Sequence, residues 1–358
     1  MKILYDHQMF SMQKFGGITR YFCDLITHLP ENVEYELPIS YSENHYLWEA
    51  GCFDLKQISS ISSFRIKRRL YYFFNQFESK RKLAVGKYDL FHPTYYSPYF
   101  YKYLDKPFVL TVHDMTHEKF RERFGKYDNT VKQKRFLVDR ASHIIAVSEN
   151  TKNDLIELLN VPEEKISVVY HGYEQRVSPT EQLYTNYILF VGDRKGYKNF
   201  DIFIKAIAPL LNQRKDLSVV CTGYSFLKEE LTLFAQLSVE NQLHHINATD
   251  AQLASLYKYA LVFVYPSLYE GFGIPILEAY ANSCPVCLSR ASCFPEIARD
   301  AALYFDPTDM DSILLSILNV IENKQYVEDL RTRGSERLKE FSIQRMVRRT
   351  CDVYGKII

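Results

Sequence analysis

The feature that most limits the fold of this chain is a repeated alternation between short apolar runs and longer amphipathic segments. Residues 187–191 and 261–265 combine β-branched and aromatic side chains, which favours buried strands. Residues 200–213 instead carry apolar side chains at helical spacing. Such alternation is typical of βαβ units, in which parallel strands are joined by helices. The sequence therefore predicts an α/β protein.

Two series of these units are separated by a polar stretch. Residues 174–186 contain Pro179 and show no strong periodicity, so they are the best candidate for a linker. The first series has expected strands at 3–5, 90–92, 108–112, 143–147 and 166–169, and a helix at 154–160. The second has expected strands at 187–191, 217–222, 243–246 and 261–265, and helices at 200–213, 251–259, 276–282 and 310–323.

We therefore expect two doubly wound, Rossmann-like domains that face each other across a cleft. The first covers residues 1–173, residues 174–186 are the linker, and the second covers residues 187–342. A final helix at 343–358 could pack back on the first domain. In such sheets ligands bind beyond the carboxyl ends of the strands, so polar residues at those ends are the candidates for function.

Composition and charge narrow the class of protein. A net charge of +1 argues against a surface built for nucleic acid, and no run of about 18 apolar residues predicts a membrane-spanning helix. Lys2 and Asp6 interrupt the first apolar run too early for a signal peptide. The seven scattered cysteines lack the spacing of a disulfide framework, and the pair Cys284 and Cys287 has no second pair to complete a zinc site. We expect buried reduced thiols and a cytoplasmic protein.

The segment from Glu270 to Glu278 carries the most chemical detail. It follows an expected strand and leads into an expected helix. Gly271 and Gly273 allow the backbone to approach a ligand closely, and Pro275 suits the first position of a helix. The amides at a helix start bind anions, while the two carboxylates can bind hydroxyl groups on either side. This pattern predicts a site for a sugar attached to a diphosphate.

Two further turns could contact phosphate. Arg194, Lys195 and Lys198 follow the strand 187–191 and could neutralise a diphosphate, although a solvated basic turn would have the same pattern. The pair Gly16 and Gly17 follows the first strand and opens a helix, but a tight turn explains it equally simply.

His113 ends another strand and could hydrogen-bond a substrate near its reacting carbon, although a lone histidine is more often structural. His92, Tyr95 and Tyr96 follow an earlier strand and could form an acceptor platform. The pair Asp309 and Asp311 resembles a metal-binding D-x-D, but its place at a helix start favours capping.

One segment interrupts the alternating pattern. Residues 64–82, from Phe64 to Lys82, contain six further Lys and Arg side chains, one acid (Glu78), and a central aromatic run at 70–74. A basic, aromatic helix of this kind can lie on an anionic membrane surface. A helix that packs on the core and leaves a solvated basic face is the alternative, and both stay open at this point.

These motifs together resemble the large retaining glycosyltransferase family 4, which has the GT-B fold. The pair Glu270 and Glu278 resembles the E-x7-E motif of that family, and the form of the cationic turn looks like that of bacterial polysaccharide mannosyltransferases. The resemblance is strong after residue 187 and looser before it. It rests on residues 267–275, 285–296 and 301–307, on the turn 191–199, and on Gly16–Gly17 and His113–Asp114.

The resemblance implies a role for each candidate residue. Glu278 would bind the ribose of a nucleotide, Glu270 would hold hydroxyls of the transferred sugar, and Arg194 and Lys198 would stabilise the diphosphate. His113 would lie near the anomeric carbon. The phosphate would be cradled by backbone amides of Phe272, Gly273 and Ile274, with Gly16 and Gly17 from the other domain, and the region around Ile246 would face the base.

By the same resemblance, the chain is expected to be a retaining hexosyltransferase that needs no catalytic metal. Its donor would be a nucleotide diphosphate sugar, with GDP-mannose favoured, and its acceptor a saccharide or lipid-linked saccharide in cell-surface polysaccharide or lipopolysaccharide synthesis. Residues 64–82 could contact the cytoplasmic face of the inner membrane, and no nucleic-acid partner is expected. Two details depart from the family: Ser283 and Cys284 stand where many members have glycine, and Lys195 could share the role of Arg194. The alternatives are another sugar-nucleotide enzyme, such as an epimerase, and a non-catalytic sugar-nucleotide-binding subunit.

Overall fold

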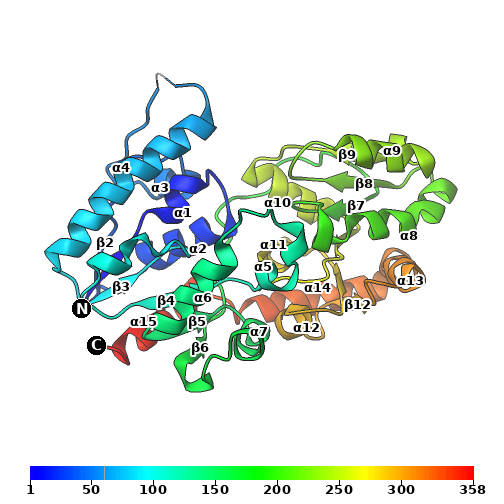
Figure 1. Ribbon diagram of the computed structural model, residues 1–358. Helices are drawn as coiled ribbons and strands as arrows, with labels where there is room; N and C mark the ends of the chain where they lie inside the picture. The colour runs from blue at the N-terminus through cyan, green and yellow to red at the C-terminus, as the bar shows by residue number, and fades with distance from the viewer. Residues whose placement is uncertain (60) are drawn as a thin grey trace. The chain divides into compact units, whose positions relative to one another are not determined.

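Figure 1 shows the computed structural model of the chain, which describes residues 1–59 and 61–358. The chain divides into two compact units, each with its own core. Unit 1 comprises Met1–Gly172 and Ile343–Ile358, and unit 2 comprises Tyr173–Ser342. All paired strands in both units are parallel, so each unit is built from βαβ connections.

Unit 2 contains one six-stranded sheet in the order β12-β11-β10-β7-β8-β9. Numbered within the unit, this is the 6-5-4-1-2-3 order of a doubly wound Rossmann sheet, which reverses direction between its first and fourth strands. The central strands are buried on both faces, which explains their continuous apolar sequences. The strands are β7 (Tyr187–Phe190), β8 (Ser218–Cys221), β9 (Leu243–His245), β10 (Val262–Tyr265), β11 (Val286–Ser289) and β12 (Leu303–Phe305).

The helices of unit 2 cover this sheet. Two of them, α8 and α13, contact each other and share a core with β7, β8 and β10. Local signals fix several helix starts: Thr249 and Asp309 accept hydrogen bonds from amides of the helices that follow them, so Asp309 is a capping residue as expected. The helices are α8 (Phe200–Gln213), α9 (Lys228–Gln236), α10 (Asp250–Tyr259), α11 (Ile274–Ala281), α12 (Phe294–Ala298), α13 (Met310–Glu322) and α14 (Lys324–Leu338).

Unit 1 has two three-stranded parallel sheets, in the orders β2-β1-β3 and β4-β5-β6. A single parallel bridge between Phe91 and Phe108 joins β3 to the segment that enters β4. The strands are β1 (Lys2–Tyr5), β2 (Glu34–Glu36), β3 (Leu90–His92), β4 (Val109–Val112), β5 (His143–Ala146) and β6 (Ile166–Val168). The helices are α1 (Gln8–Met12), α2 (Gly17–Thr27), α3 (His45–Ala50), α4 (Phe64–Val85), α5 (Thr116–Lys119), α6 (Thr130–Arg140), α7 (Glu149–Leu159) and α15 (Ile343–Gly355).

The last helix, α15, belongs to unit 1 although it follows unit 2 in the sequence (Figure 1). Met346, Val347 and Tyr354 join the same core as residues of β1 and β3. The Tyr354 hydroxyl lies 3.0 Å from the Tyr5 hydroxyl and 2.6 Å from Nδ1 of His92. The core of unit 1 is thus formed by residues from β1, β3 and α15 together.

Most expected elements are present, with shifted ends. The helix expected at 154–160 is longer and begins at Glu149, because the Ser148 hydroxyl accepts a hydrogen bond from the amide of Thr151 and caps the helix. Residues 174–186 contain no helix or strand and belong to unit 2, where the Thr180 amide donates to the Ser255 hydroxyl. Cys284 and Cys287 are buried free thiols, as expected, whereas Cys52 is exposed.

Residues 64–82 form most of the 22-residue helix α4. Within residues 1–59 and 61–358, the structure contains no helix that combines the length and the apolar character needed to cross a bilayer.

Candidate functional site

The candidate site of unit 2 lies at the point where the strand order of its sheet reverses. Strands β7 and β10 are hydrogen-bonded neighbours there. The segments that leave their carboxyl ends touch, since the amide of Leu268 donates to the carbonyl of Tyr197 over 2.7 Å. A Rossmann sheet binds its ligand in the crevice beyond such a switch point.

Lys198 and Glu270 meet across this switch point. The Lys198 Nζ atom lies 2.6 Å from Oε1 of Glu270, and both side chains are less than one-fifth exposed. Burial alone would lower the pKa of Lys198, but the Glu270 carboxylate, with smaller contributions from Tyr265 and Tyr197, raises it above its usual value. Lys198 is therefore held as a cation with little surrounding water.

Two hydroxyl groups fix the glutamates. The amide of Glu270 donates to the hydroxyl of Ser292 over 3.0 Å, and that hydroxyl donates back to the Glu270 carbonyl. The Tyr257 hydroxyl donates to Oε2 of Glu278 over 3.0 Å, from α10 to α11. Ser292 thus fixes the backbone of Glu270, whereas Tyr257 orients the carboxylate of Glu278 and limits the rotamers it can adopt.

The turn between the glutamates leads directly into α11. Gly273 is the N-cap residue with φ of +93°, a conformation that favours glycine. A Cβ atom there would lie 3.1 Å from side-chain atoms of Ile276 and Phe294. Phe272 and Ile274 flank this cap, and Gly273 has no side chain to cap the amides of the first turn. Such a helix start suits an anionic group.

Arg194 and Lys198 have different partners. Its guanidinium is buried and forms an ion pair with Glu230, with Nε 2.8 Å from Oε1. Nη1 donates to the backbone carbonyl of Thr222, and Nη2 donates to those of Tyr224 and Ser225. The neighbouring Lys195 is exposed instead. The contact of Arg194 with a diphosphate therefore stays a prediction, and its present partners are protein groups.

The region expected to face the base begins at Ile246, directly after β9. The Ile246 amide donates to the carbonyl of Cys221, at the end of the adjacent strand β8. Nε2 of His245 lies 2.9 Å from the carbonyl of Gly223. Ile246 therefore stands beside the segment that follows β8.

In unit 1, Gly16 and Gly17 begin α2. Gly16 is the N-cap residue, and Gly17 is exposed as the first helical residue. A Cβ atom on Gly16 would lie 2.2 Å from the Gln13 side-chain oxygen, so the loop leaves no room for a larger residue unless Gln13 moves. The placement at the start of an 11-residue helix matches the sequence prediction, while the phosphate role stays a prediction.

His113 lies at the end of β4 within a group of buried rings. Its ring stacks on His171, with centroids 5.8 Å apart, and meets Tyr21 edge to face at 5.3 Å. Burial lowers the pKa of His113 to about 3, with the neighbouring Asp114 opposing that shift. Nε2 of His113 has no hydrogen-bond partner within the described part of the chain. The ring is thus neutral, and its buried Nε2 is left without a hydrogen-bond partner among the described residues.

Two of the three residues proposed for the acceptor platform, His92 and Tyr96, form hydrogen bonds with other protein groups. Nδ1 of His92 contacts Tyr354 and Nε2 contacts Thr111 at 2.8 Å, while the Tyr96 hydroxyl accepts from the His113 amide at 3.1 Å. Tyr95 is only partly buried. Of this group, Tyr95 is thus the ring best placed to meet an acceptor.

The sequence analysis named the two glutamates, Arg194 and Lys198 as candidate site residues, but it missed the residues that contact them. Tyr257, Ser292 and Glu230 carry no motif of their own. Tyr257 gave a usable signal, because a tyrosine on the buried face of a helix needs a partner for its hydroxyl. Among residues 1–59 and 61–358, no cluster of three or more His, Cys, Asp or Glu side chains could hold a metal ion.

Two Rossmann-like units, the second with paired glutamates at its switch point, define the GT-B class of glycosyltransferase. The comparisons agree with this class. The model described as Glycosyltransferase Family 4 matches residues 15–175, and the model described as Glycosyl transferases group 1 matches residues 174–337. The chain belongs to this glycosyltransferase family, with one model matching each half.

Individual relatives point to O-antigen enzymes. The chain is 29% identical to the O-antigen chain mannosyltransferase B of Escherichia coli, over 78% of this chain and 81% of that protein. It is 33% identical to the O-antigen chain mannosyltransferase RfbU of Salmonella typhimurium, over 59% of this chain and 60% of that protein. The fold is similar to that of Anabaena HepE, crystallised with UDP and glucose, with a TM-score of 0.76 and 16% identity over 99% of both chains.

Proposed function

We propose that this glycosyltransferase transfers mannose from GDP-mannose to a saccharide or lipid-linked saccharide, with retention of the anomeric configuration, in the synthesis of a cell-surface polysaccharide. The observation that carries the proposal is the Lys198–Glu270 pair at the switch point, directly beside the start of α11. The mannosyl donor is supported by the names of the two O-antigen relatives.

The proposed roles follow from charge and position. Departure of the nucleotide places negative charge on the diphosphate, and a buried cation stabilises that charge better than a solvated one. Lys198 is such a cation, and the amides of Phe272, Gly273 and Ile274 would contact the same phosphates. Glu278, held by Tyr257, would accept hydrogen bonds from the ribose. Glu270 would bind hydroxyls of mannose.

Residues of unit 1 would complete the reaction centre. His113 is neutral, so Nε2 could exchange a hydrogen bond with a sugar hydroxyl near the anomeric carbon without adding a charge there. Gly16 and Gly17 would bring backbone amides to the phosphates. With Lys198 and helix amides meeting the charge, no metal ion is required by this scheme.

The first experiment measures mannosyl transfer from GDP-mannose to a lipid-linked saccharide acceptor by Lys198→Met, Glu270→Gln and Glu278→Gln. We expect kcat to fall about 100-fold or more for Lys198→Met, as for removal of one preorganised charge-stabilising group. Lys205→Met, at an exposed lysine of α8, is the matched control and should transfer at the wild-type rate. Wild-type rates in the three site variants would contradict the assignment.

The same assay separates the alternatives. Retention predicts an α-linked product from GDP-α-mannose. The one-bond C1–H1 coupling constant of the product in the NMR spectrum identifies the anomer, and a β-linked product would contradict retention. An altered nucleotide sugar formed without acceptor would favour an epimerase. Nucleotide binding without any turnover would favour a non-catalytic subunit.

We further propose that α4 contacts the anionic cytoplasmic surface of the inner membrane. Four residues of α4 at helical spacing face the core: Tyr71, Asn75, Ser79 and Leu83. Ile66, Phe73 and Phe77 lie on another face, because steps of seven and four residues return to nearly the same side of a helix. These three side chains are 52%, 66% and 65% exposed.

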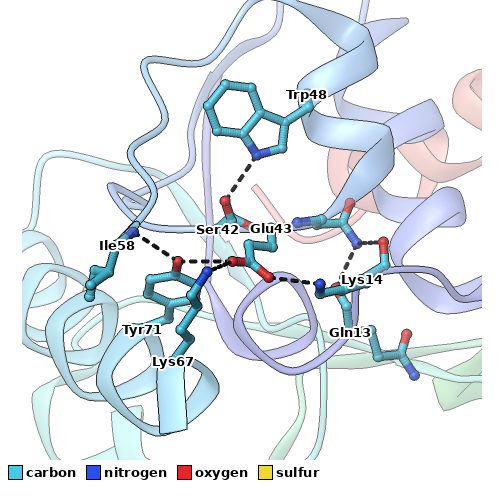
Figure 2. A network of polar contacts seen from close by, with 9 residues as sticks. Gln13, Lys14, Ser42, Glu43, Trp48, Ile58, Lys67 and Tyr71 are labelled. Carbon is cyan, nitrogen blue, oxygen red and sulfur yellow. Dashed lines mark hydrogen bonds and ion pairs between the residues drawn. The ribbon is translucent and has the colours of Figure 1, made fainter. Parts of the chain in front are cut away.

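The basic side chains in the first turns of α4 are of two kinds. Figure 2 shows Lys67 in an ion pair with Glu43, which also binds Lys14 and the Tyr71 hydroxyl. This part of α4 is therefore fixed to the segment that precedes α3. Arg65, Arg68 and Arg69 are exposed, and the described chain offers them no ion pair. They remain available for acidic lipid headgroups.

Vesicle sedimentation tests this contact. The vesicles contain phosphatidylglycerol at about 30%, on the order of its share in a bacterial inner membrane. Each arginine contributes about 1 kcal/mol near such an anionic surface. The triple variant Arg65→Glu/Arg68→Glu/Arg69→Glu should therefore lower the binding constant by at least about 100-fold. Phe73→Ser/Phe77→Ser should also release the protein. Leu315→Ser, at a 64% exposed residue of α13, is the control. Unchanged binding in both α4 variants would remove the membrane contact.

A further inference from the structure

The guanidinium of Arg194 donates to protein groups: one carboxylate and three backbone carbonyls. A guanidinium has five N–H donors. In Arg194, Nε, Nη1 and Nη2 each donate to the Glu230 carboxylate or to one of three backbone carbonyls, and the side chain is only 3% exposed. A bidentate bond to a diphosphate would require several of these contacts to break in a buried site.

The three carbonyls belong to one segment. Thr222, Tyr224 and Ser225 lie in the segment 222–227, which follows β8 and precedes α9. Glu230 holds the other end of the same segment, because its Oε2 accepts from the Leu227 amide over 2.7 Å. One ion pair therefore fastens both ends of the segment.

Further contacts fix the segment in the same place. The Gly192 amide donates to the Thr222 hydroxyl, and the Gly223 carbonyl contacts His245. Gly223 has φ of +94°, and a Cβ atom there would lie 2.5 Å from the Gly192 carbonyl oxygen. The segment thus lies against the end of β7. Its Tyr224 ring nevertheless remains 77% exposed, so its outer side is accessible to a ligand.

We propose that Arg194 and Glu230 are positioning residues, which hold the segment 222–227 for the nucleoside of the donor, and that Arg194 does not contact the diphosphate. This inference rests on the proposed function. The segment leaves the carboxyl end of β8, beside the Ile246 region and beside the turn that carries Lys198. The cation that meets the phosphates is then Lys198, with the exposed Lys195 nearby in sequence.

The test compares ligands that differ only in phosphate. Isothermal titration calorimetry with GDP and with guanosine is carried out on the full chain, for wild type, Arg194→Met and Glu230→Gln. If the pair positions the nucleoside segment, both variants raise Kd for both ligands by a similar factor, about tenfold. Lys198→Met serves as the comparison and should weaken GDP much more than guanosine.

Two further variants protect the test against general unfolding. Arg194→Met/Glu230→Met replaces both charges by apolar groups, which usually preserves a fold better than loss of one partner. Its Kd values should match those of Arg194→Met, because the two residues act as a unit. Arg337→Met is the matched control: Arg337 is also buried and binds the carbonyls of Glu296 and Ile297, but has no contact with the segment 222–227.

Three results would overturn the inference. The first is a loss in Arg194→Met that appears with GDP and not with guanosine, while Glu230→Gln binds normally, since that marks a direct phosphate contact. The second is an equal loss in Arg337→Met, which marks general destabilisation. The third is unchanged amide hydrogen exchange in residues 223–227 of ligand-free Arg194→Met and Glu230→Gln. Because exchange needs no ligand, it tests the positioning role even if wild type binds neither GDP nor guanosine, a result that would contradict the proposed donor instead.

Discussion

Unit 1 should lose stability steeply as the pH falls from 7.0 to 5.5, because it buries several neutral histidines. His7, His92 and His113 have their pKa lowered to about 3 by burial, and burial lowers the pKa of His171 well below its ordinary value. All four side chains are at least nine-tenths buried and belong to unit 1.

The sign follows from proton uptake. Between the folded and unfolded pKa values, the unfolded chain binds a proton at each histidine and the folded chain does not, so acid favours the unfolded state. The full stability is present above the ordinary pKa of about 6.5 and is lost progressively below it. Asp6 opposes this, since burial raises its pKa and the folded state keeps that proton longer.

The magnitude is large compared with the stability of a domain. For one histidine with these pKa values, the free energy of unfolding falls by about 1.3 kcal/mol between pH 7.0 and 5.5. Four histidines give an upper limit of about 5 kcal/mol, which is similar to the whole stability of a marginal domain.

Urea unfolding at a series of pH values, followed by hydrogen exchange of peptides from each unit, measures this effect. We expect residues 1–172 to lose protection before residues 173–342. His7→Gln should lower the number of protons taken up on unfolding by about one, and His45→Gln, at a half-exposed histidine of the same unit, is the control for the substitution. Equal stability of unit 1 at pH 7.0 and 5.5 would refute the reasoning.

Three other predictions concern unit 2. Glu270→Gln should lower the free energy of unfolding by about 3 kcal/mol, because it leaves the buried Lys198 cation without its carboxylate partner. The double variant Lys198→Met/Glu270→Gln should lose less stability than that; additive losses in urea titrations would argue against coupling of the two residues. Tyr257→Phe should raise Kd for GDP several-fold in calorimetry by freeing Glu278, and an unchanged Kd would mean that the hydroxyl does not orient it. Gly273→Ala should lower Tm by several degrees, since its positive φ and close neighbours both disfavour a Cβ atom; an unchanged Tm would show that the turn adapts freely.

The sequence predicted the fold where burial leaves a strong local pattern. Strands β7 and β10 are buried on both faces, so they appear as continuous apolar runs. Strands β11 and β12 gave weaker signals and were not predicted as strands, because β11 contains Cys287 and Ser289 and β12 has only three residues. The switch point itself depends on strand order, which no local pattern encodes.

The candidate site was predictable only in part, because its contacts join distant residues. The pair Glu270 and Glu278 is separated by one turn and part of one helix, so its motif is local. The contact between Lys198 and Glu270 joins two strand ends and could be expected only from the fold. The partner of Arg194 could not be predicted, since Glu230 looks like an ordinary acid in the first turn of a helix. The roles of these residues stay predictions.

The placement of α15 has a consequence for the order in which the chain folds during synthesis. Unit 2 is one continuous stretch and can form its core as soon as residue 342 has left the ribosome. The first part of unit 1 emerges before unit 2. Nδ1 of His92 and the Tyr5 hydroxyl nevertheless lack the Tyr354 hydroxyl as a partner until Tyr354 has been translated. We therefore expect the earlier part of the chain to acquire its native core last, and a ribosome stalled before residue 343 to present a folded unit 2 preceded by an unfinished unit 1.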